Sequence, residues 1–178
     1  MKSQLDATWY QQYAFRVSEV LKVWSRDSSK IEDVVPIDIF RGDYKQRQVE
    51  CAVELYGHMG IQREDKAGRL YGLRRNFEFF DAPHIAIICM ESSFGIGVAL
   101  DVGMYVQTLM LAMQTRGIGS CAQASMRHYP DIVRQELGIR DDLRILCGVA
   151  FGYEDQEVPA NRTVQARTLI ENSVLFLD

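Results

Sequence analysis

Two glycines behind an apolar run are the first candidates for chemistry in this chain. The run "HIAIICM" leads into "SSFGIGVAL", a strand–turn–helix pattern of the kind that can hold the phosphates of a dinucleotide. That fingerprint needs G-x-G-x-x-G, but Leu100 stands where the third glycine belongs, and "TRGIGSCAQ" supplies no acidic residue about twenty positions further on. We therefore interpret Gly95 and Gly97 as shaping the entry into a helix. A parallel nucleotide-binding sheet is the least favoured alternative.

Other reactive residue types lack the spacing that their chemistry needs. The histidines are scattered without the spacing of a zinc site, and the serines lack the G-x-S-x-G turn of hydrolases. The cysteines, which are Cys51, Cys89, Cys121 and Cys147, form no C-x-x-C pair. We expect them to be reduced, with Cys89 and Cys147 packed as small hydrophobes in strands, and we expect no metal site.

Hydrophobic periodicity predicts the elements that must position any site. Longer helices are predicted at Trp9–Trp24, Tyr44–Met59 and 98–116. Two short helices are predicted, one in "QREDKAGRLYGLRR" and one in "YPDIVRQELG", where Pro130 marks the start and Gly138 the end. Strands are predicted at 84–90, 144–153 and 174–177. The helix at 98–116 is apolar around most of its circumference, so a large core or a partner subunit should cover it. This alternation favours an α/β or α+β sandwich around a helix-covered sheet.

Length and charge limit the classes that remain. With 178 residues the chain is predicted to be a single domain, residues 1–178. A net charge of −4 argues against binding to nucleic acid or to an anionic membrane. The start "MKSQLDATWY" has no signal-peptide pattern, and apolar runs such as "HIAIICM" are too short to span a bilayer. We expect a cytoplasmic protein.

Several longer segments, in matching order, resemble the FMN-dependent nitroreductase family and in particular its nitrobenzoate-reductase-like branch. They are "RRNFEFFDAPHIAII", "GVALDVGMYVQTLMLAMQTRGIGSCAQASMRHYPDIVRQELGI", "CGVAFGYEDQEVPANR" and "ARTLIENSVLF". The combination of N-F-x-F-F-x-A-P, L-D-x-G-M-x-x-Q and G-Y-E-D-x-x-x-P-x-N-R is specific, whereas each motif alone is weak. The similarity runs from Arg74 to Phe176 and is less distinct from Tyr44 to Leu73.

The resemblance implies both a fold and an activity. The fold would be α+β, a three-layer sandwich with a mostly antiparallel central sheet flanked by helices, in an intertwined homodimer with FMN sites at the subunit interface. The activity would be that of an NAD(P)H oxidoreductase that uses NADH or NADPH as co-substrate. It would reduce nitroaromatics, quinones or similar small aromatic acceptors by hydride transfer through flavin N5, with no catalytic side chain.

The resemblance also implies which residues would bind the cofactor. In "CAQAS", Gln123, Ala124 and Ser125 match a loop whose backbone amides face the flavin N5 and O4 edge; a plain strand-to-helix connection is the alternative. Arg167 matches a basic residue that pairs with the FMN phosphate. Gln165 falls where some members carry a second basic group, and Arg162 could compensate for its missing charge. Without the resemblance, these arginines would be ordinary surface charges.

Asn76, in "RRNF", falls near a family asparagine that hydrogen-bonds the flavin pyrimidine edge, with a spacing that differs by one. It could equally cap or turn the loop before the strand. The phenylalanines that follow it, Phe77, Phe79 and Phe80, are predicted to pack in the core or an interface.

Two family segments are not found in the sequence. They are an N-terminal R-x-S-x-R-x-F, whose arginines grip the FMN phosphate, and a P-S-x-x-N-x-Q-P-W-like stretch that contacts the ring. We therefore expect an N-terminally shortened domain, truncated naturally or artificially, with weakened FMN binding. Loss of two charged hydrogen bonds would cost about 3–6 kcal/mol. The alternative hypothesis is a non-catalytic, flavin-deficient relative that acts as a dimeric small-ligand-binding protein.

Overall fold

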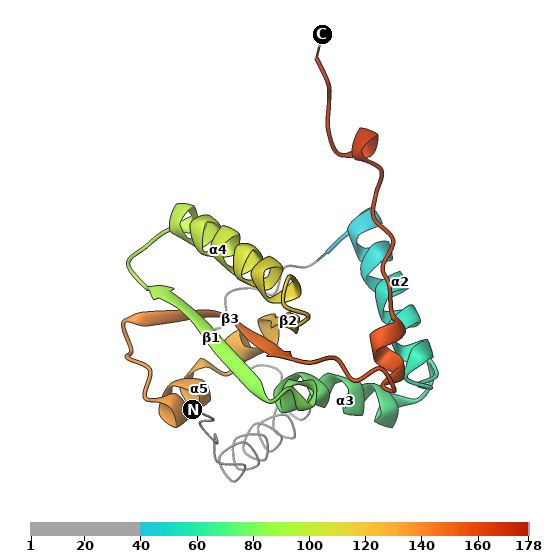
Figure 1. Ribbon diagram of the computed structural model, residues 1–178, viewed down its shortest axis with the longest axis horizontal. Helices are drawn as coiled ribbons and strands as arrows, with labels where there is room; N and C mark the ends of the chain where they lie inside the picture. The colour runs from blue at the N-terminus through green and yellow to red at the C-terminus, as the bar shows by residue number, and fades with distance from the viewer. Residues whose placement is uncertain (1–39, 178) are drawn as a thin grey trace. The chain divides into compact units, whose positions relative to one another are not determined.

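The computed structural model describes residues 40–177, and the predicted helix at Trp9–Trp24 lies outside them. The chain divides into two compact units, which are described here one at a time. In the described residues, the first unit is Leu70–Glu154 and the second combines the stretch up to Arg69 with the stretch from Asp155 onward. Figure 1 shows the helices and strands of both.

An antiparallel sheet forms the centre of the first unit. Its strands are β1 (His84–Glu91), β2 (Gly119–Gln123) and β3 (Leu143–Gly152), in the order β1-β3-β2. Both β1 and β2 run antiparallel to β3. A nucleotide-binding fold needs parallel strands, so this sheet excludes that alternative. The strands predicted at 84–90 and 144–153 are confirmed as β1 and β3.

Short helices and turns cover one face of this sheet. They are η2 (Arg75–Asp81), η3 (Ala124–His128) and α5 (Pro130–Leu137). Their side chains form a core with strand residues; the buried members are Phe77, Phe79, Met126, Val133, Ile145 and Ala150. Helix α5 has Pro at its start and ends at Gly138, which adopts the left-handed conformation (φ 63°) that glycine tolerates best. The predicted capped helix is therefore confirmed.

Two glycines of β3 allow neighbouring segments to approach the strand closely. A Cβ on Gly148 would lie 2.7 Å from Cγ of Met126 in η3, and a Cβ on Gly152 would lie 2.6 Å from Cδ of Pro83. Neither distance is compatible with normal packing, so only glycine fits at these positions. The β3 strand thus supports both η3 and the residues that connect η2 to β1.

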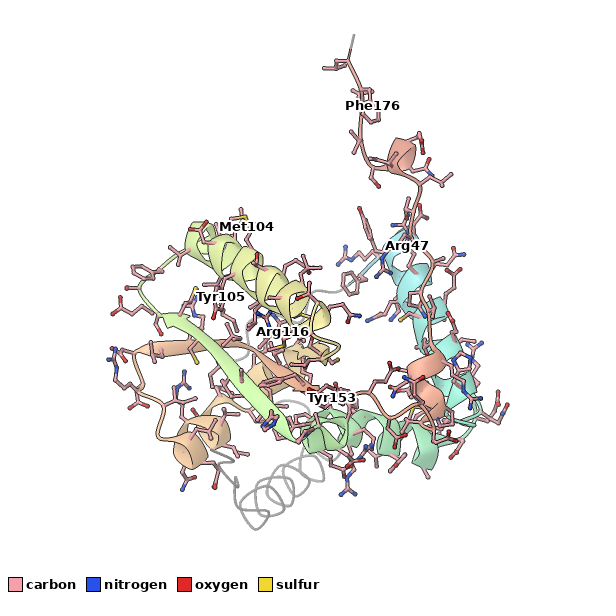
Figure 2. The ribbon with its side chains drawn as sticks, viewed as in Figure 1. Arg47, Met104, Tyr105, Arg116, Tyr153 and Phe176 are labelled. Carbon is pink, nitrogen blue, oxygen red and sulfur yellow. The ribbon has the colours of Figure 1, made fainter. Side chains whose placement is uncertain are left out.

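Helix α4 (Ile96–Gln114) contacts β1 and β2 but is mostly exposed within the chain. Val106 is its buried residue, whereas Met104 and Tyr105, labelled in Figure 2, are 55% and 61% exposed. Residues 40–177 therefore leave most of α4 uncovered, and the predicted cover by a partner subunit stays a prediction. In the described chain, α4 is also the one helix with the length and composition to cross a membrane. The uninterrupted apolar runs of the sequence, such as "HIAIICM", did not indicate this. Its length and composition are weak evidence, because core helices of water-soluble proteins meet the same criteria.

Two predictions about strands were wrong. Residues 174–177, predicted as a strand, have no strand conformation, and Leu175 and Leu177 are 82% and 83% exposed. A strand needs a hydrogen-bonded neighbour, which apolar composition alone does not supply. The sequence reading also missed β2, which contains glycine, serine and alanine in place of the β-branched residues that mark strands.

The second unit is built around α2 (Gly42–His58), which confirms the helix predicted at Tyr44–Met59. Polar contacts join α2 to the C-terminal segment: His58 Nδ1 lies 2.9 Å from Thr163 Oγ1. Two short turns, η4 (Pro159–Arg162) and η5 (Ile170–Asn172), follow in that segment. None of the residues of α2 is buried.

Helix α3 (Lys66–Arg74) continues the chain from the second unit into the first and confirms the short predicted helix. Asp65 caps its start, because Oδ1 accepts a hydrogen bond of 2.8 Å from the backbone N–H of Gly68.

Candidate functional site

Residues 123–125 leave the end of β2 and enter η3. The side chain of Gln123 points inward and is 2% exposed, whereas Ala124 is exposed. The Ser125 Oγ is buried and has no hydrogen-bond partner among residues 40–177. This segment therefore presents mainly backbone and one small side chain to its surroundings, which suits the close approach of a flat ring.

A hydrogen bond connects this segment to η2. Nε2 of Gln123 donates to the backbone carbonyl of Asn76 at 2.6 Å, across 47 positions of sequence. The carbonyl can only accept, so this contact fixes the orientation of the amide, and Oε1 is left without a partner in the described chain. Two residues predicted separately as site residues thus meet directly.

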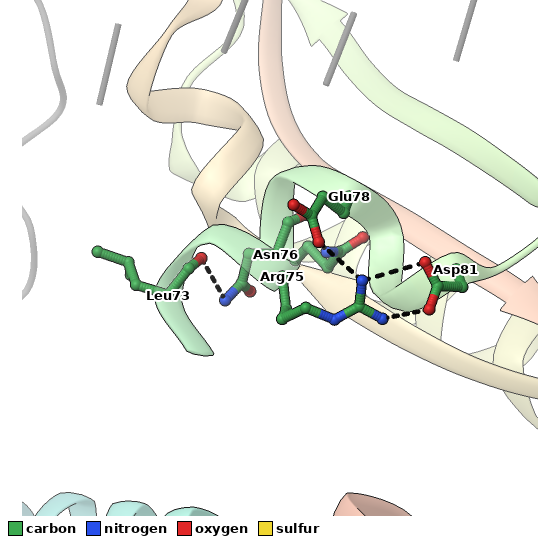
Figure 3. Close-up of polar contacts among 6 residues, drawn as sticks. Leu73, Arg75, Asn76, Glu78 and Asp81 are labelled. Carbon is green, nitrogen blue, oxygen red and sulfur yellow. Dashed lines mark hydrogen bonds and ion pairs between the residues drawn. The ribbon is translucent and has the colours of Figure 1, made fainter. Parts of the chain in front are cut away.

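The side chain of Asn76 has a local partner as well. Its Nδ2 donates to the carbonyl oxygen of Leu73 at 3.3 Å, the contact drawn at the left of Figure 3. This contact matches the predicted turn-forming role. The flavin-binding role predicted for Asn76 stays a prediction.

The turn that follows Asn76 has an unusual backbone. Phe79, Phe80 and Asp81 all adopt positive φ, at 52°, 55° and 61°. For residues other than glycine this conformation costs roughly 1–2 kcal/mol each. Burial of Phe79, which is 1% exposed, is one contact that offsets this cost.

Arg75 makes the polar contacts that close the same turn (Figure 3). Its Nη1 donates to Glu78 at 2.7 Å and to Asp81 Oδ1 at 3.0 Å, and its Nη2 donates to Asp81 Oδ2. The Arg75 side chain is 17% exposed. The hydrogen bond to Asp81 raises the pKa of Arg75 above its ordinary value, against the opposing effect of burial. The guanidinium is therefore a permanent charge.

Sequence reasoning missed both this turn and the two supporting glycines. A glycine inside a strand pattern is a usable signal for close approach, and Gly148 in "LCGVAFG" carries it. The left-handed turn has no such signal, because Phe-Phe-Asp is not a sequence that favours positive φ.

The predicted phosphate-binding residues lie in the second unit. Arg162 and Arg167 are exposed, and Arg167 donates to the carbonyl oxygen of Gln165 at 3.2 Å. The Gln165 amide donates to the Glu54 carboxylate at 2.8 Å. Its predicted role in FMN binding is untested, but in this arrangement its amide already has a partner.

Thiols and candidate metal ligands add no further site in the part of the chain that the structure describes. The four cysteines are free; Cys51 and Cys121 are exposed, and Cys89 and Cys147 are half-buried in strands. Burial raises the pKa of the Cys89 and Cys147 thiols, which disfavours their reactive thiolate form. No group of three or more His, Cys, Asp or Glu is placed to hold a metal ion within residues 40–177.

Comparison with solved structures tests the fold. The FMN-dependent nitroreductase NfnB of Mycobacterium smegmatis, solved in complex with NADPH, superposes with a TM-score of 0.83 at 27% sequence identity. The match covers 98% of this chain and 77% of that one. The α+β nitroreductase-like fold implied by the sequence is thereby confirmed.

Curated relatives agree. Nitroreductase NfnB of Mycolicibacterium smegmatis is 38% identical over 124 residues, which are 69% of this chain and 52% of the relative. A 4-nitrobenzoate reductase from a Nocardioides species is 34% identical over 135 residues, which are 75% of this chain and 55% of the relative. The chain thus spans about half the length of these relatives.

A family model, described as the nitroreductase family, matches residues 10–153. The match includes β1, α4, β2 and β3, together with η2 and the segment at 123–125. On this evidence the chain belongs to the nitroreductase family.

Proposed function

We propose that this chain is an FMN-dependent NAD(P)H oxidoreductase that reduces nitroaromatic, quinone or similar small aromatic acceptors. The observation that carries the proposal is the segment at 123–125, which turns its polar side chain inward and leaves backbone and Ala124 outward. The relatives named above, a nitroreductase and a nitrobenzoate reductase, support this class of acceptor.

The protein's part in this chemistry is to bind and orient. Bound FMN would supply the redox chemistry, taking a hydride from NADH or NADPH and passing electrons to the acceptor. Backbone N–H groups at Gln123, Ala124 and Ser125 would hold the polar edge of the ring. Such fixed dipoles tune a redox group without a catalytic acid or base. Asn76 would contribute at the pyrimidine edge with its Oδ1 or its second N–H, because one N–H already donates to Leu73.

Arg167 is the proposed partner of the FMN phosphate, with Arg162 as a second cation on the same segment. A guanidinium can donate two parallel hydrogen bonds to phosphate oxygens, and Arg167 uses only one N–H group on Gln165. Glu54, which holds the Gln165 amide, opposes an anion there. We therefore assign Gln165 the smallest contribution of the three.

We also propose that two copies form the working unit through α4. Its exposed apolar residues Ile96, Leu100, Met104, Tyr105 and Leu111 are between 55% and 88% exposed within the chain. Ile96, Leu100, Met104 and Leu111 share one side of the helix, and an exposed apolar face of this kind marks an interaction site. A homodimer that buries it accounts for the composition of α4 without a membrane. With the net charge of −4, this supports a cytoplasmic protein that binds neither nucleic acid nor membrane.

The test of the activity is reconstitution with FMN. We expect purified protein to retain yellow flavin and to lose the oxidised-flavin absorbance when NADH or NADPH is added, with recovery on addition of 4-nitrobenzoate. Arg167→Gln should weaken FMN binding about tenfold or more, the effect of losing a hydrogen bond between charged groups. Arg140→Gln is the matched control, since Arg140 pairs with Asp142 at an exposed site.

A folded protein that stays colourless at high FMN concentration would contradict the enzyme hypothesis. It would favour the alternative, a dimeric protein that binds a small ligand without redox activity. Molar mass in solution tests the dimer separately: Leu100→Glu should give monomers, and a wild-type monomer would contradict the α4 interface.

A further inference from the structure

The proposed function does not explain why the backbone at Phe79–Asp81 is strained. Three consecutive residues other than glycine in the left-handed region are an outlier, and such outliers persist only where surrounding contacts impose them. The turn ends η2 and begins three residues after Asn76, and the backbone carbonyl of Asn76 accepts the hydrogen bond from Gln123. The element that contains the strained turn therefore contacts the candidate flavin segment through Asn76.

Arg75 supplies the side-chain hydrogen bonds that hold the turn, beside the backbone hydrogen bond of 3.0 Å from the Ala82 N–H to the Phe79 carbonyl. It donates to Glu78 and to both carboxylate oxygens of Asp81, and so spans the positive-φ residues from one side. The fork geometry of a guanidinium suits this bidentate contact, which an ammonium group cannot reproduce. At 17% exposure, the Arg75 side chain is better shielded than an ordinary surface charge.

A short covalent and hydrogen-bonded path runs from Arg75 to the flavin segment. Asn76 is the next residue in the chain, and its carbonyl is bound by Nε2 of Gln123 at 2.6 Å. Gln123 is 2% exposed, so its side chain contacts protein and not a ligand. What it can control is the position of its own backbone and that of Ala124, the atoms assigned to the flavin edge.

We propose that Arg75 is a positioning residue for the flavin segment: it holds the left-handed turn at Phe79–Asp81 and, through the Asn76–Gln123 hydrogen bond, sets the backbone of residues 123–125. The proposal rests on the proposed function for its consequence, which is tighter FMN binding. Its structural part concerns the protein without cofactor and can be tested alone.

The first measurement uses cofactor-free protein. Arg75→Gln should shift the backbone amide NMR signals of Gln123, Ala124 and Ser125 and the side-chain amide signals of Gln123. Arg140→Gln is the matched control, because Arg140 also donates twice to one carboxylate, that of Asp142, outside η2. It should leave those signals unchanged. Unchanged signals in a folded Arg75→Gln protein would overturn the proposal.

A second-site variant separates turn geometry from general stability. Glycine adopts positive φ without steric cost, so Asp81→Gly should relax the turn. In the Arg75→Gln background it should return the signals of residues 123–125 toward their wild-type positions. Failure of this rescue would count against the turn as the connecting element. If Arg75→Gln does not fold, Arg75→Lys, which keeps the charge and loses the fork, should give intermediate shifts; wild-type signals there would overturn the proposal.

FMN affinity, measured by quenching of flavin fluorescence, tests the functional consequence. Arg75→Gln should bind FMN on the order of tenfold more weakly, the lower end of the loss seen at metal sites when groups that orient a ligand are removed. The Asp81→Gly rescue should recover most of this loss, and Arg140→Gln should bind normally. If wild-type protein binds no FMN, the proposed function fails, while the NMR shifts still decide whether Arg75 positions the segment.

Discussion

The two compact units bury their apolar residues to very different extents. Among the described residues, the first unit contains the sheet and nine buried hydrophobic residues, from Phe77 to Ala150, and the second contains one, Ile61. Both units expose large apolar side chains, on α4 in the first and at Leu169 (70%) and Phe176 (69%) in the second. The first unit thus has a core of its own, and the second needs another surface to cover its apolar residues.

The largest expected difference between the units comes from removing one phenylalanine in each. Phe77→Ala should lower the free energy of unfolding by about 3–5 kcal/mol, because it empties a buried site. Phe176→Ala should change it by no more than about 0.5 kcal/mol in monomeric protein. Denaturant unfolding measures both. A large effect of Phe176→Ala that grows with protein concentration would identify a second copy as the covering surface.

Replacing glycine by alanine should change the stability of the two units in opposite directions. Gly152→Ala should destabilise the fold by about 1–3 kcal/mol, because its Cβ would lie 2.6 Å from the rigid ring of Pro83. Gly57→Ala, in α2 with open space around it, should stabilise by roughly 0.5–1 kcal/mol. Thermal unfolding of the two variants checks the signs. A neutral Gly152→Ala would mean that β3 can move away from Pro83.

The polar contacts of the second unit should contribute less to the free energy of unfolding than the packing of the first unit does. Thr163→Val removes the hydrogen bond to His58 and should cost no more than about 0.5–1 kcal/mol, because both groups are exposed. Hydrogen exchange should quicken in the segment after Pro159 and stay unchanged in β3. Faster exchange throughout the sheet would contradict the division into two units.

The smallest expected effect is a pH dependence in the first unit. Burial, helped by the charge of Arg127, lowers the pKa of His128 below its ordinary 6.5. In the window from about 6.5 down to that lowered value, the unfolded chain takes up a proton that the folded chain does not. Stability should therefore fall as the pH drops through this window, and His128→Gln should flatten the fall. Unfolding measured at pH 7.5 and pH 5 tests this; an unchanged slope in the variant would contradict it.

Sequence patterns predicted the elements of the first unit that carry their own signal. Apolar runs identified β1 and β3, and proline and glycine identified both ends of α5. The strand β2 has no such signal, because its pairing with β3 and not its composition makes it a strand. The segment at 174–177 shows the converse: apolar residues without a neighbouring strand stay irregular.

The candidate site was predictable in part. Resemblance to the family pointed to Gln123 and Asn76 separately, and the hydrogen bond between them was not foreseeable from the sequence. The left-handed turn was hidden too, since burial of Phe79 in the core and the hydrogen bonds from Arg75 to Asp81 override the local preference of the backbone. Sequence identified candidate groups, and packing determined how they are held.

The glycines of β3 have a consequence for how the site can vary. Gly148 and Gly152 are four residues apart, so they lie on the same side of the strand, about 13 Å from each other at the usual rise per residue. Gly148 supports η3, which contains part of the candidate flavin segment, and Gly152 supports the residues after η2. Because one strand sets this separation, the sequences of both loops can diverge while the span between them stays constant, and substrate preference can change without rebuilding the scaffold.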